Sequence, residues 1–426
     1  MKTAADSTGP INIAYLMTWF PKLTETFVLD EILAVERCGA AVEIFPLLRK
    51  KGEPVHPEAL PLLERVHFQP LLSLRIGAAH WHYMRRSPHT YCRTLVELLR
   101  GSVGSLRCLI GTLAFFPKTV FFARQMEELD IDHIHAHFAS NPALAAWVIH
   151  RLTGIPYSFT AHGSDLHVDR TMLDEKIRSA AFAVTVSSFN MEVMVRACGE
   201  KGRGKIHVLH CGVDVDALQP KTDWSQGGPL EILCVASFGE VKGHTYLIDA
   251  CRILAERGID FRCRLIGEGP LRRRITRQIA AAALAGRFRI HGGLARPEVE
   301  RRLRQADLFV LPSVPTPEGR REGIPVALME AMATALPVTA SDLSGIPELV
   351  EHNVCGQLVQ PRDSVGLADS IERYHHDPRF RQSMGRAARE KVIDRFNLEK
   401  SAGRLVVLFE RHAAAGIGKE PRCELP

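Results

Sequence analysis

Short apolar runs alternate along the chain with longer amphipathic stretches, and each kind of block has the length of a secondary-structure element. An apolar run at 11–17 is followed by a stretch that predicts a helix from Phe27 to Cys38, closed by Gly39, and by a second apolar run at 42–47. Later runs of strand length lie at 182–187, 206–214, 230–236, 261–266, 308–311, 337–340 and 356–359. Strands that alternate with helices in this way build parallel sheets covered by helices. The pattern therefore predicts a doubly wound α/β protein.

One segment divides this pattern into two halves. Residues 219–229 are rich in Pro, Gly and polar side chains, and the alternation starts again after them. A chain of 426 residues also exceeds the length of one compact core. We expect an N-terminal Rossmann-like domain over 10–218 and a C-terminal one over 230–415, the latter ending in a single helix that begins near Asp363.

Residues 57–128 break the alternation within the first half, because they are helical in pattern and rich in aromatic and basic side chains. Between Met84 and Arg124 there are seven Arg or Lys residues against one acidic residue, Glu97. A basic stretch with an apolar face is typical of a segment that lies on an anionic membrane surface. A pair of ordinary surface helices, separated at Pro117, explains the pattern equally well. Nucleic acid is not an expected partner, since no module that reads bases accompanies the charge.

Composition indicates a globular protein of a reducing compartment. The chain is 46% hydrophobic and 24% charged, with a net charge of +6. Its ten cysteines are scattered without a Cys-x-x-Cys pair, which predicts neither a disulfide framework nor a zinc site. The first ten residues are polar, unlike a signal peptide, and no apolar run has the length of a membrane-spanning helix. We expect a cytoplasmic protein, with peripheral attachment to the inner face of the plasma membrane as a further hypothesis.

The stretch from Glu318 to Ala333 contains the clearest candidate site. It follows the apolar run at 308–311, forms a loop of Pro, Gly and charged residues, and continues into a predicted helix after Pro325. The start of a helix has free N–H groups and partial positive charge, which suits a phosphate at the edge of a parallel sheet. Glu322 precedes this point and Glu330 follows it by about two turns, so a bound nucleotide-sugar would have a carboxylate on each side of its diphosphate. Two solvated glutamates on an ordinary amphipathic helix give the same spacing.

A second loop of the same half offers a cation. Residues 237–244 follow the apolar run at 230–236 and contain Lys242. If the two loops lie side by side at the carboxyl edge of the sheet, Lys242 faces any phosphate held at the Glu322 loop.

Histidines mark the corresponding edge of the first half. His133, His135 and His137 alternate along a predicted strand and share one of its faces. Such histidines can ligate a metal, but no carboxylate or cysteine follows at ligand spacing, so we expect a structural role for His133 and His135 and no metal. His162 and Asp165 follow another strand where it opens into a loop with a glycine. A pair of this kind is also common in polar turns without function.

With both halves considered, the chain resembles the retaining, nucleotide-sugar-dependent glycosyltransferases of family 4, and within them those of the colanic-acid and exopolysaccharide type. The most specific motif is Glu322-x7-Glu330 with the Ala-Met-Ala that follows it. Further agreement lies at Val213-Asp214, Lys242-Gly243, Gly267-x-Gly269-Pro270, 306–313, 345–348, 20–27 and 162–165. The resemblance covers about Ile11 to Arg411 and implies the GT-B fold, two Rossmann-like domains that face each other across a cleft.

The resemblance also implies roles for individual residues. Glu322 would lie at the donor sugar beside the reacting carbon, and Glu330 would bind the ribose hydroxyls. Lys242 would neutralise the diphosphate, and His162 would lie near the leaving phosphate and the acceptor. The remaining contacts that it implies are Gly239, Gly323, Ile324, Pro325 and Val326 for the donor, and Asp165, Thr24 and Glu25 on the acceptor side.

Departures from the family pattern occur at two positions and in one loop. Ser237 stands where the family often has an arginine, the second cation on the diphosphate, and we expect Arg320, Arg321 or His244 to replace it. Cys211 replaces the usual Asn before Gly212, which we interpret as structural. The glycine-rich loop that other branches have near the first strand is absent.

The function implied is transfer of a sugar from a UDP- or GDP-sugar to a hydroxyl of a growing, lipid-linked saccharide. A helix N-terminus and Lys242 would stabilise the leaving diphosphate without a metal or other cofactor, which agrees with the lack of an Asp-x-Asp motif in the phosphate loops. A sugar-nucleotide epimerase on the same architecture is one alternative, whereas a phosphorylase would need a cofactor-bearing lysine for which no segment matches. A non-catalytic nucleotide-binding subunit of a polysaccharide assembly complex is the alternative without turnover.

Overall fold

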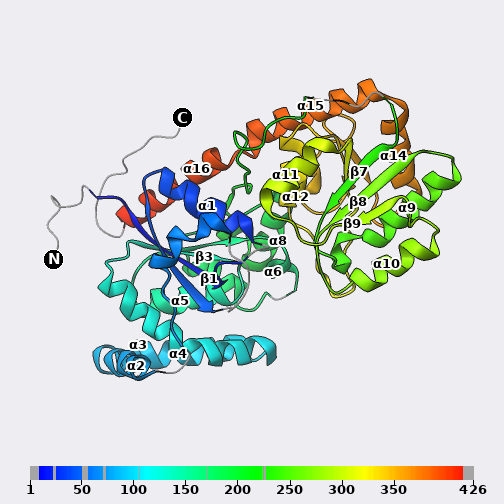
Figure 1. Cartoon of the computed structure of the whole chain (residues 1–426). Helices are drawn as coiled ribbons and strands as arrows, with labels where there is room; N and C mark the ends of the chain where they lie inside the picture. The colour runs from blue at the N-terminus through cyan, green and yellow to red at the C-terminus, as the bar shows by residue number, and fades with distance from the viewer. Residues whose placement is uncertain are drawn as a thin grey trace. The chain divides into compact units, whose positions relative to one another are not determined.

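The computed structural model describes residues 9–22, 25–49, 56–70, 73–104, 106–168, 170–222, 224 and 227–415. The chain forms two compact units, one of Met1–Leu209 with Glu399–Pro426 and the other of His210–Leu398. Each unit contains a six-stranded parallel sheet with helices packed on it (Figure 1). The predicted architecture of two Rossmann-like α/β domains is therefore confirmed.

The sheet of the first unit has the strand order β2-β1-β3-β4-β5-β6. Its strands are β1 (Asn12–Trp19), β2 (Ala41–Leu48), β3 (His133–His137), β4 (Tyr157–Ala161), β5 (Phe182–Thr185) and β6 (Ile206–Val208). β3 and β4 are buried along their whole lengths, and in their parallel register His137 lies beside Thr160. The histidines of β3 therefore lie inside the core of this unit.

The helices of the first unit cover this sheet and bury their apolar faces on it. In α1, Val28, Ile32 and Val35 recur at helical spacing and are buried. The helices are α1 (Thr26–Arg37), α5 (Asn141–Thr153), α6 (Ser164–His167), α7 (Leu173–Ser179), α8 (Ser188–Cys198) and α16 (Leu398–Ala415).

The insertion predicted between strands is helical, with α2 (Leu74–Arg86), α3 (Pro88–Ser102) and α4 (Leu106–Glu128). The expectation that Pro117 separates two helices is wrong, because Pro117 lies inside the continuous helix α4. Proline removes one helical hydrogen bond, but the buried Val120 and Phe122 anchor the turns after it in the core. Lys118 is not a surface cation either, since it is buried and its Nζ donates to the Leu47 carbonyl at 2.7 Å. Burial lowers the pKa of Lys118 to about 8.

The sheet of the second unit has the order β12-β11-β10-β7-β8-β9, with β7 and β10 as its central neighbours. Its strands are β7 (Leu230–Val235), β8 (Phe261–Ile266), β9 (Phe288–Ile290), β10 (Leu308–Leu311), β11 (Val338–Ser341) and β12 (Gln357–Val359). Its helices are α9 (His244–Glu256), α10 (Arg272–Ala281), α11 (Arg296–Gln305), α12 (Val326–Ala333), α13 (Ile346–Leu349), α14 (Ser364–His376) and α15 (Pro378–Arg395). The apolar faces of these elements meet in one core cluster.

The C-terminal part is three helices, α14, α15 and α16, where the sequence analysis expected one helix from Asp363. The break after α14 has a local cause. The Asp377 side chain accepts a hydrogen bond from the Phe380 N–H at 2.8 Å, and Pro378 occupies the first position of α15. Both features are typical of a helix start.

The division between the units also differs from the predicted linker at 219–229. Val213, Val215 and Leu218 are buried in the core of the second unit, and the strand expected over 206–214 ends at Val208. The last helix, α16, returns to the first unit, where the Phe409 ring lies 5.2 Å from the ring of His133 and 5.9 Å from that of Phe182. The boundary between the units is therefore set by which core the apolar side chains join, and not by the Pro- and Gly-rich composition of 219–229. Among the described helices, none is both long and apolar enough to cross a membrane.

Candidate functional site

Two loops of the second unit meet where the neighbouring strands β7 and β10 end. The Val314 N–H donates to the Val241 carbonyl at 2.9 Å, which joins the loop after β10 to the loop after β7. Gly243 has φ +66°, and a Cβ at this position would lie only 1.8 Å from the Pro312 carbonyl oxygen. The close approach of the loops therefore requires glycine at this position.

This contact brings Lys242 and Glu322 together. The Lys242 Nζ lies 2.9 Å from each oxygen of the Glu322 carboxylate, and the two side chains are 20% and 12% exposed. Water screens such a partly buried ion pair less than it screens a surface pair. The structure thus places the predicted cation at the predicted carboxylate, while the ligand that they bind stays a prediction.

Both residues lie beside the start of α12. Pro325 is its N-cap residue and supplies no side-chain cap, and the first turn of the helix has no acidic residue. The first N–H groups of a helix have no partner within the helix, and the helix dipole is positive there. Glu330 is half-buried on the same helix. The other predicted donor contacts lie in the two loops and at this helix start: Gly239, Gly323, Ile324 and Val326.

The three candidates for a second cation differ in their surroundings. His244 is buried, and its Nδ1 has no hydrogen-bond partner among the residues that the structure describes. Burial, assisted by Lys242, lowers the pKa of His244 to about 4, so His244 is neutral at pH 7 and does not replace an arginine. Arg320 and Arg321 are exposed in the loop that contains Glu322, and Ser237 is exposed as well. The arginines remain the candidates for the missing charge.

In the first unit, Asp165 fixes the loop that follows β4. Its buried carboxylate accepts N–H hydrogen bonds from Ala139 at 2.7 Å, from Gly163 at 2.7 Å and from His162 at 3.1 Å. The carboxylate thereby holds the backbone at His162 against the end of β3. Its predicted contact with an acceptor stays a prediction.

The side chain of His162 is enclosed by three rings. The ring centroids of Phe27, Phe138 and His137 lie 4.7, 4.8 and 5.3 Å away, and the His137 ring is stacked at 19°. The Nε2 atom of His162 lies 3.1 Å from Nδ1 of His137. Burial, followed by the neighbouring His137, lowers the pKa of His162 to about 3 although Glu31 opposes this shift. His162 is therefore neutral at pH 7.

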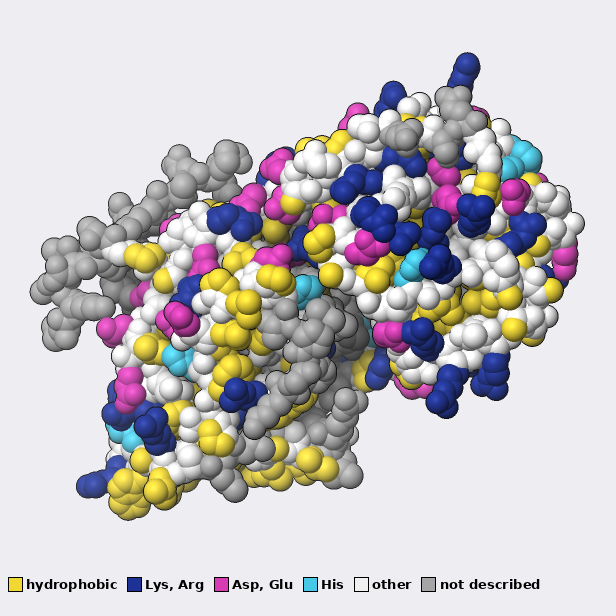
Figure 2. Space-filling view, in the orientation of Figure 1, with side chains coloured by type: hydrophobic (Ala, Val, Ile, Leu, Met, Phe, Trp, Pro, Cys, Tyr) yellow, Lys and Arg dark blue, Asp and Glu magenta, His cyan; other side chains and the backbone are white. Residues whose placement is uncertain are grey.

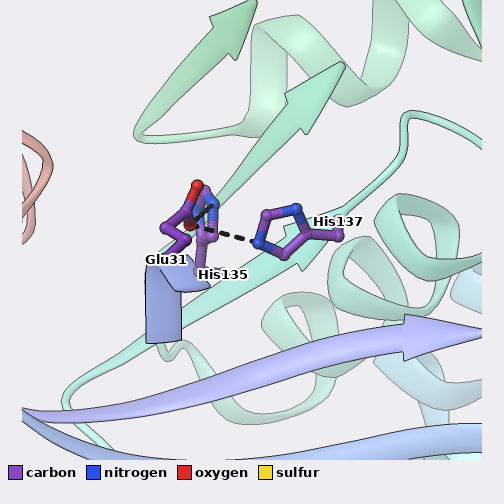
Figure 3. A group of neighbouring side chains, drawn as sticks. All are labelled: Glu31, His135 and His137. Carbon is purple, nitrogen blue, oxygen red and sulfur yellow. Dashed lines mark hydrogen bonds and ion pairs between the residues drawn. The ribbon is translucent and has the colours of Figure 1, made fainter. Parts of the chain in front are cut away.

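Glu31 is a functional candidate that the sequence analysis missed. It projects from α1 toward the histidines of β3, with its Oε1 3.1 Å from the His137 Nε2 and 3.8 Å from the His135 Nε2 (Figure 3). The Tyr15 hydroxyl donates to the same oxygen at 3.0 Å. Although burial raises the pKa of Glu31, the histidines, His137 foremost, lower it to about 2. One signal was present in the sequence: a glutamate next to the inward face of an amphipathic helix.

Glu31, His135 and His137 also lie close enough together to hold a metal ion. Hydrogen bonds already occupy their nitrogens, however. His135 Nδ1 lies 2.8 Å from the Ser158 hydroxyl and His135 Nε2 lies 2.9 Å from the Thr160 hydroxyl. His137 is paired on one side with Glu31 and on the other with His162, so each ring nitrogen of these two histidines has a hydrogen-bond partner within the protein. The expectation that no metal binds here stays a prediction.

The remaining acceptor-side candidates, Thr24 and Glu25, stand just before α1. Thr24 lies outside the described residues. Glu25 precedes α1, forms an ion pair with Lys22, and lines a small hollow together with Phe20 and His56. No contact of the structure tests the predicted role of Glu25 on the acceptor side.

Comparisons with known proteins agree with the motifs. The family described as Glycosyltransferase Family 4 matches residues 82–217, and the family described as Glycosyl transferases group 1 matches residues 218–391. A Salmonella typhimurium glycosyltransferase whose name places it in colanic acid biosynthesis is 40% identical over 432 residues, covering 94% of this chain and 100% of that protein. The amylovoran biosynthesis glycosyltransferase of Erwinia amylovora is 40% identical over 209 residues, a match that spans only about half of either chain, 49% and 51%.

A solved structure shows the same fold at low identity. The Anabaena protein crystallised with UDP-glucose superposes with a TM-score of 0.68 and 18% identity, covering 93% of this chain and 98% of that one.

Replacing Gly243 with alanine should destabilise the second unit more than the same change at Gly258. Both glycines have positive φ, +66° and +78°, so alanine costs about 1–2 kcal/mol of backbone strain at either position. Only at Gly243 does the added methyl meet a backbone carbonyl, which should add about 1–3 kcal/mol, whereas nothing lies within 4 Å at Gly258. Urea unfolding of both variants measures the difference. Equal losses would contradict the close approach of the two loops.

Proposed function

This chain belongs to the GT-B glycosyltransferases of family 4, and we propose that it transfers a sugar from a nucleotide diphosphate sugar to a saccharide during exopolysaccharide biosynthesis. One observation carries the proposal: the paired Lys242 and Glu322 lie beside the uncapped start of α12. The names of the bacterial relatives support the polysaccharide assignment. The Anabaena structure with UDP-glucose supports a nucleotide-sugar donor.

The donor would bind to the second unit. Its diphosphate would accept hydrogen bonds from the N–H groups at the start of α12, with Lys242 and one of the loop arginines as counter-charges. Glu322 would accept hydrogen bonds from the sugar hydroxyls, and Glu330, about two turns along the helix, from the ribose. These groups are held in place before the donor arrives, because strands β7 and β10 are neighbours and Gly243 lets their loops touch.

The reaction would break the bond between the anomeric carbon and the phosphate oxygen and form a bond from that carbon to the acceptor oxygen. Negative charge develops on the leaving diphosphate, where the helix start and Lys242 lower its energy. The acceptor proton would pass to the leaving phosphate, and the anomeric configuration would be retained. His162 of the first unit would contact the reacting sugars, and a lipid-linked saccharide would be the acceptor.

An anionic membrane surface is the proposed partner of the helical insertion. Several large apolar side chains are exposed on it: Leu74 95%, Val103 70%, Trp81 61%, Ile110 60% and Leu113 54%. In Figure 2, yellow and dark-blue side chains gather over the part where Figure 1 labels α2, α3 and α4. Residues 74–128 contain eight basic and three acidic residues, so the charge of the insertion is complementary to acidic lipid headgroups. Such a surface would bring the enzyme to a lipid-linked acceptor.

Replacing Glu322 with glutamine should reduce turnover by about 100-fold or more while leaving the fold intact, because the sugar loses a charged hydrogen-bond acceptor in the transition state. The measurement is release of UDP or GDP from a panel of sugar nucleotides with a membrane extract as acceptor. Glu318→Gln, an exposed glutamate of the same loop, is the matched control and should stay close to wild type.

The same assay separates the alternatives. Equal release by wild type and Glu322→Gln would contradict the assigned site. Conversion of the donor without any acceptor would indicate an epimerase. Donor binding without release, even with purified lipid-linked saccharide, would indicate a non-catalytic subunit.

Replacing Ser237 with arginine should tighten UDP binding by less than about threefold, because an arginine of the Glu322 loop already supplies the second cation and surface charge pairs contribute about 0–1 kcal/mol. Isothermal titration with UDP measures the change, with Arg320→Ala and Arg321→Ala as companions. A gain of tenfold or more in Ser237→Arg would show that no substitute cation is present.

Removing apolar side chains from the insertion should release the protein from anionic vesicles. Burial of a large apolar side chain contributes about 1.5–3 kcal/mol, so the double variant Trp81→Ser and Ile110→Ser should bind at least about tenfold more weakly. The control is Val354→Ser with Val365→Ser, two exposed apolar residues of the second unit. Co-sedimentation with phosphatidylglycerol vesicles measures binding. Absence of wild-type binding at low salt would overturn the membrane proposal without affecting the transferase assignment.

A further inference from the structure

We propose that Glu31 and His137 are positioning residues for His162, and that a hydrogen-bonded chain through them fixes both the orientation and the tautomer of the His162 ring. The proposal rests on the proposed function, because His162 is taken to touch the substrates. It adds Glu31, which lies 106 residues before His137 in the sequence, to the residues on which catalysis depends.

The protons along this chain follow from the charge at one end. Glu31 is an ionised carboxylate at neutral pH, since its pKa is about 2, and a carboxylate only accepts hydrogen bonds. The His137 Nε2, at 3.1 Å, therefore carries the proton and donates to Glu31. The proposal includes a neutral His137 ring, whose other nitrogen, Nδ1, is then an acceptor. The Nε2 of His162, 3.1 Å from that atom, must in turn be the donor.

This order of donors leaves Nδ1 of His162 unprotonated. An unprotonated ring nitrogen is a hydrogen-bond acceptor, so it suits a hydroxyl group of the donor sugar or the acceptor. It does not suit a phosphate oxygen, which is itself an acceptor. The resemblance to the family implied a place for His162 near the leaving phosphate, whereas its tautomer favours a sugar hydroxyl.

The surroundings of the ring restrict its rotation. Phe27 from α1 and Phe138 after β3 pack against it, and His137 stacks on it. Phe138 has φ +77°, a backbone conformation that is uncommon for a residue with a side chain and is often found near functional sites. Asp165 holds the backbone of the same loop. An orientation fixed before the substrate binds is what catalysis by positioning requires.

The rest of the histidine network forms a separate branch. His133 Nε2 and His135 Nδ1 lie 2.7 and 2.8 Å from the Ser158 hydroxyl, and His135 Nε2 lies 2.9 Å from the Thr160 hydroxyl. These contacts join β3 to β4 without involving His162. Tyr15 stacks on His137, with ring centroids 5.5 Å apart, and its hydroxyl donates to Glu31 Oε1; replacing it with phenylalanine keeps the ring and removes only the hydroxyl. Tyr15→Phe is therefore a matched control that removes a hydrogen bond from Glu31 but leaves the chain to His162 complete.

The test combines a spectroscopic and a kinetic measurement on the full chain. Nitrogen chemical shifts of labelled histidines, assigned with His137→Asn and His162→Asn, report the tautomer of each ring in the free protein. Turnover is measured with the sugar nucleotide that supports release in the panel, or with UDP-glucose as the probe. The variants are Glu31→Met, which lacks an acceptor, Glu31→Gln, whose amide oxygen is still an acceptor, and Tyr15→Phe.

Glu31→Met should give His162 a mixture of tautomers and lower kcat about 10- to 100-fold, as loss of an orienting partner does at other sites, with the KM for the donor changed less than about threefold. Glu31→Gln should retain the tautomer and most of the turnover, and Tyr15→Phe should resemble wild type.

Unchanged His162 signals in Glu31→Met would overturn the proposal, and they would do so even if no sugar nucleotide were turned over, so its failure is separate from failure of the proposed function. Loss of kcat with unchanged signals and a lower melting temperature would show a merely structural role. One equivalent of a transition metal in the purified protein, absent from Glu31→Met, would replace the proposal with a metal site.

Discussion

The parallel pairing of neighbouring strands is the constraint on which the candidate residues of each unit depend. Because all strands of a parallel sheet end at the same edge, residues that follow adjacent strands come together however far apart they are in the sequence. Lys242 and Glu322 follow β7 and β10, which are neighbours in the second sheet. His137 and His162 lie at the ends of β3 and β4, which are neighbours in the first. In each unit, strand order rather than sequence distance creates the pair.

The loops that follow the neighbouring strands can approach each other closely because of one residue in each unit. In the second unit it is Gly243, which leaves room for the Pro312 carbonyl. In the first it is the Asp165 carboxylate, which gathers the N–H groups of two loops. Both contacts fix the backbone of the loops next to Lys242, Glu322 and His162. Because these loops are ordered before a ligand binds, binding costs less conformational entropy.

Local pattern was enough to predict the two α/β units, their strands and the two loops that meet at Glu322, because periodicity and turn residues are properties of neighbouring positions. Prediction from local pattern failed where a contact between residues far apart in the sequence determines the structure. Pro117 stays within α4 because buried residues hold the helix on both sides, and α16 joins the first unit because Phe409 packs against rings from β3 and β5. The role of Glu31 could not be predicted from the sequence, because its hydrogen-bond partners lie on other elements. The break at Asp377 and Pro378 was a local signal that the sequence analysis overlooked.

The helical insertion has fewer free positive charges on its surface than its sequence suggests. Of the basic residues in the helical insertion, Lys118 is buried, and three arginines form ion pairs with glutamates of the same insertion: Arg86 with Glu127, Arg93 with Glu97 and Arg124 with Glu128. Paired charges attract lipid headgroups less than free ones do. The exposed apolar side chains are therefore the larger contribution to any membrane contact, and salt, which screens charge but not apolar burial, should weaken that contact only in part.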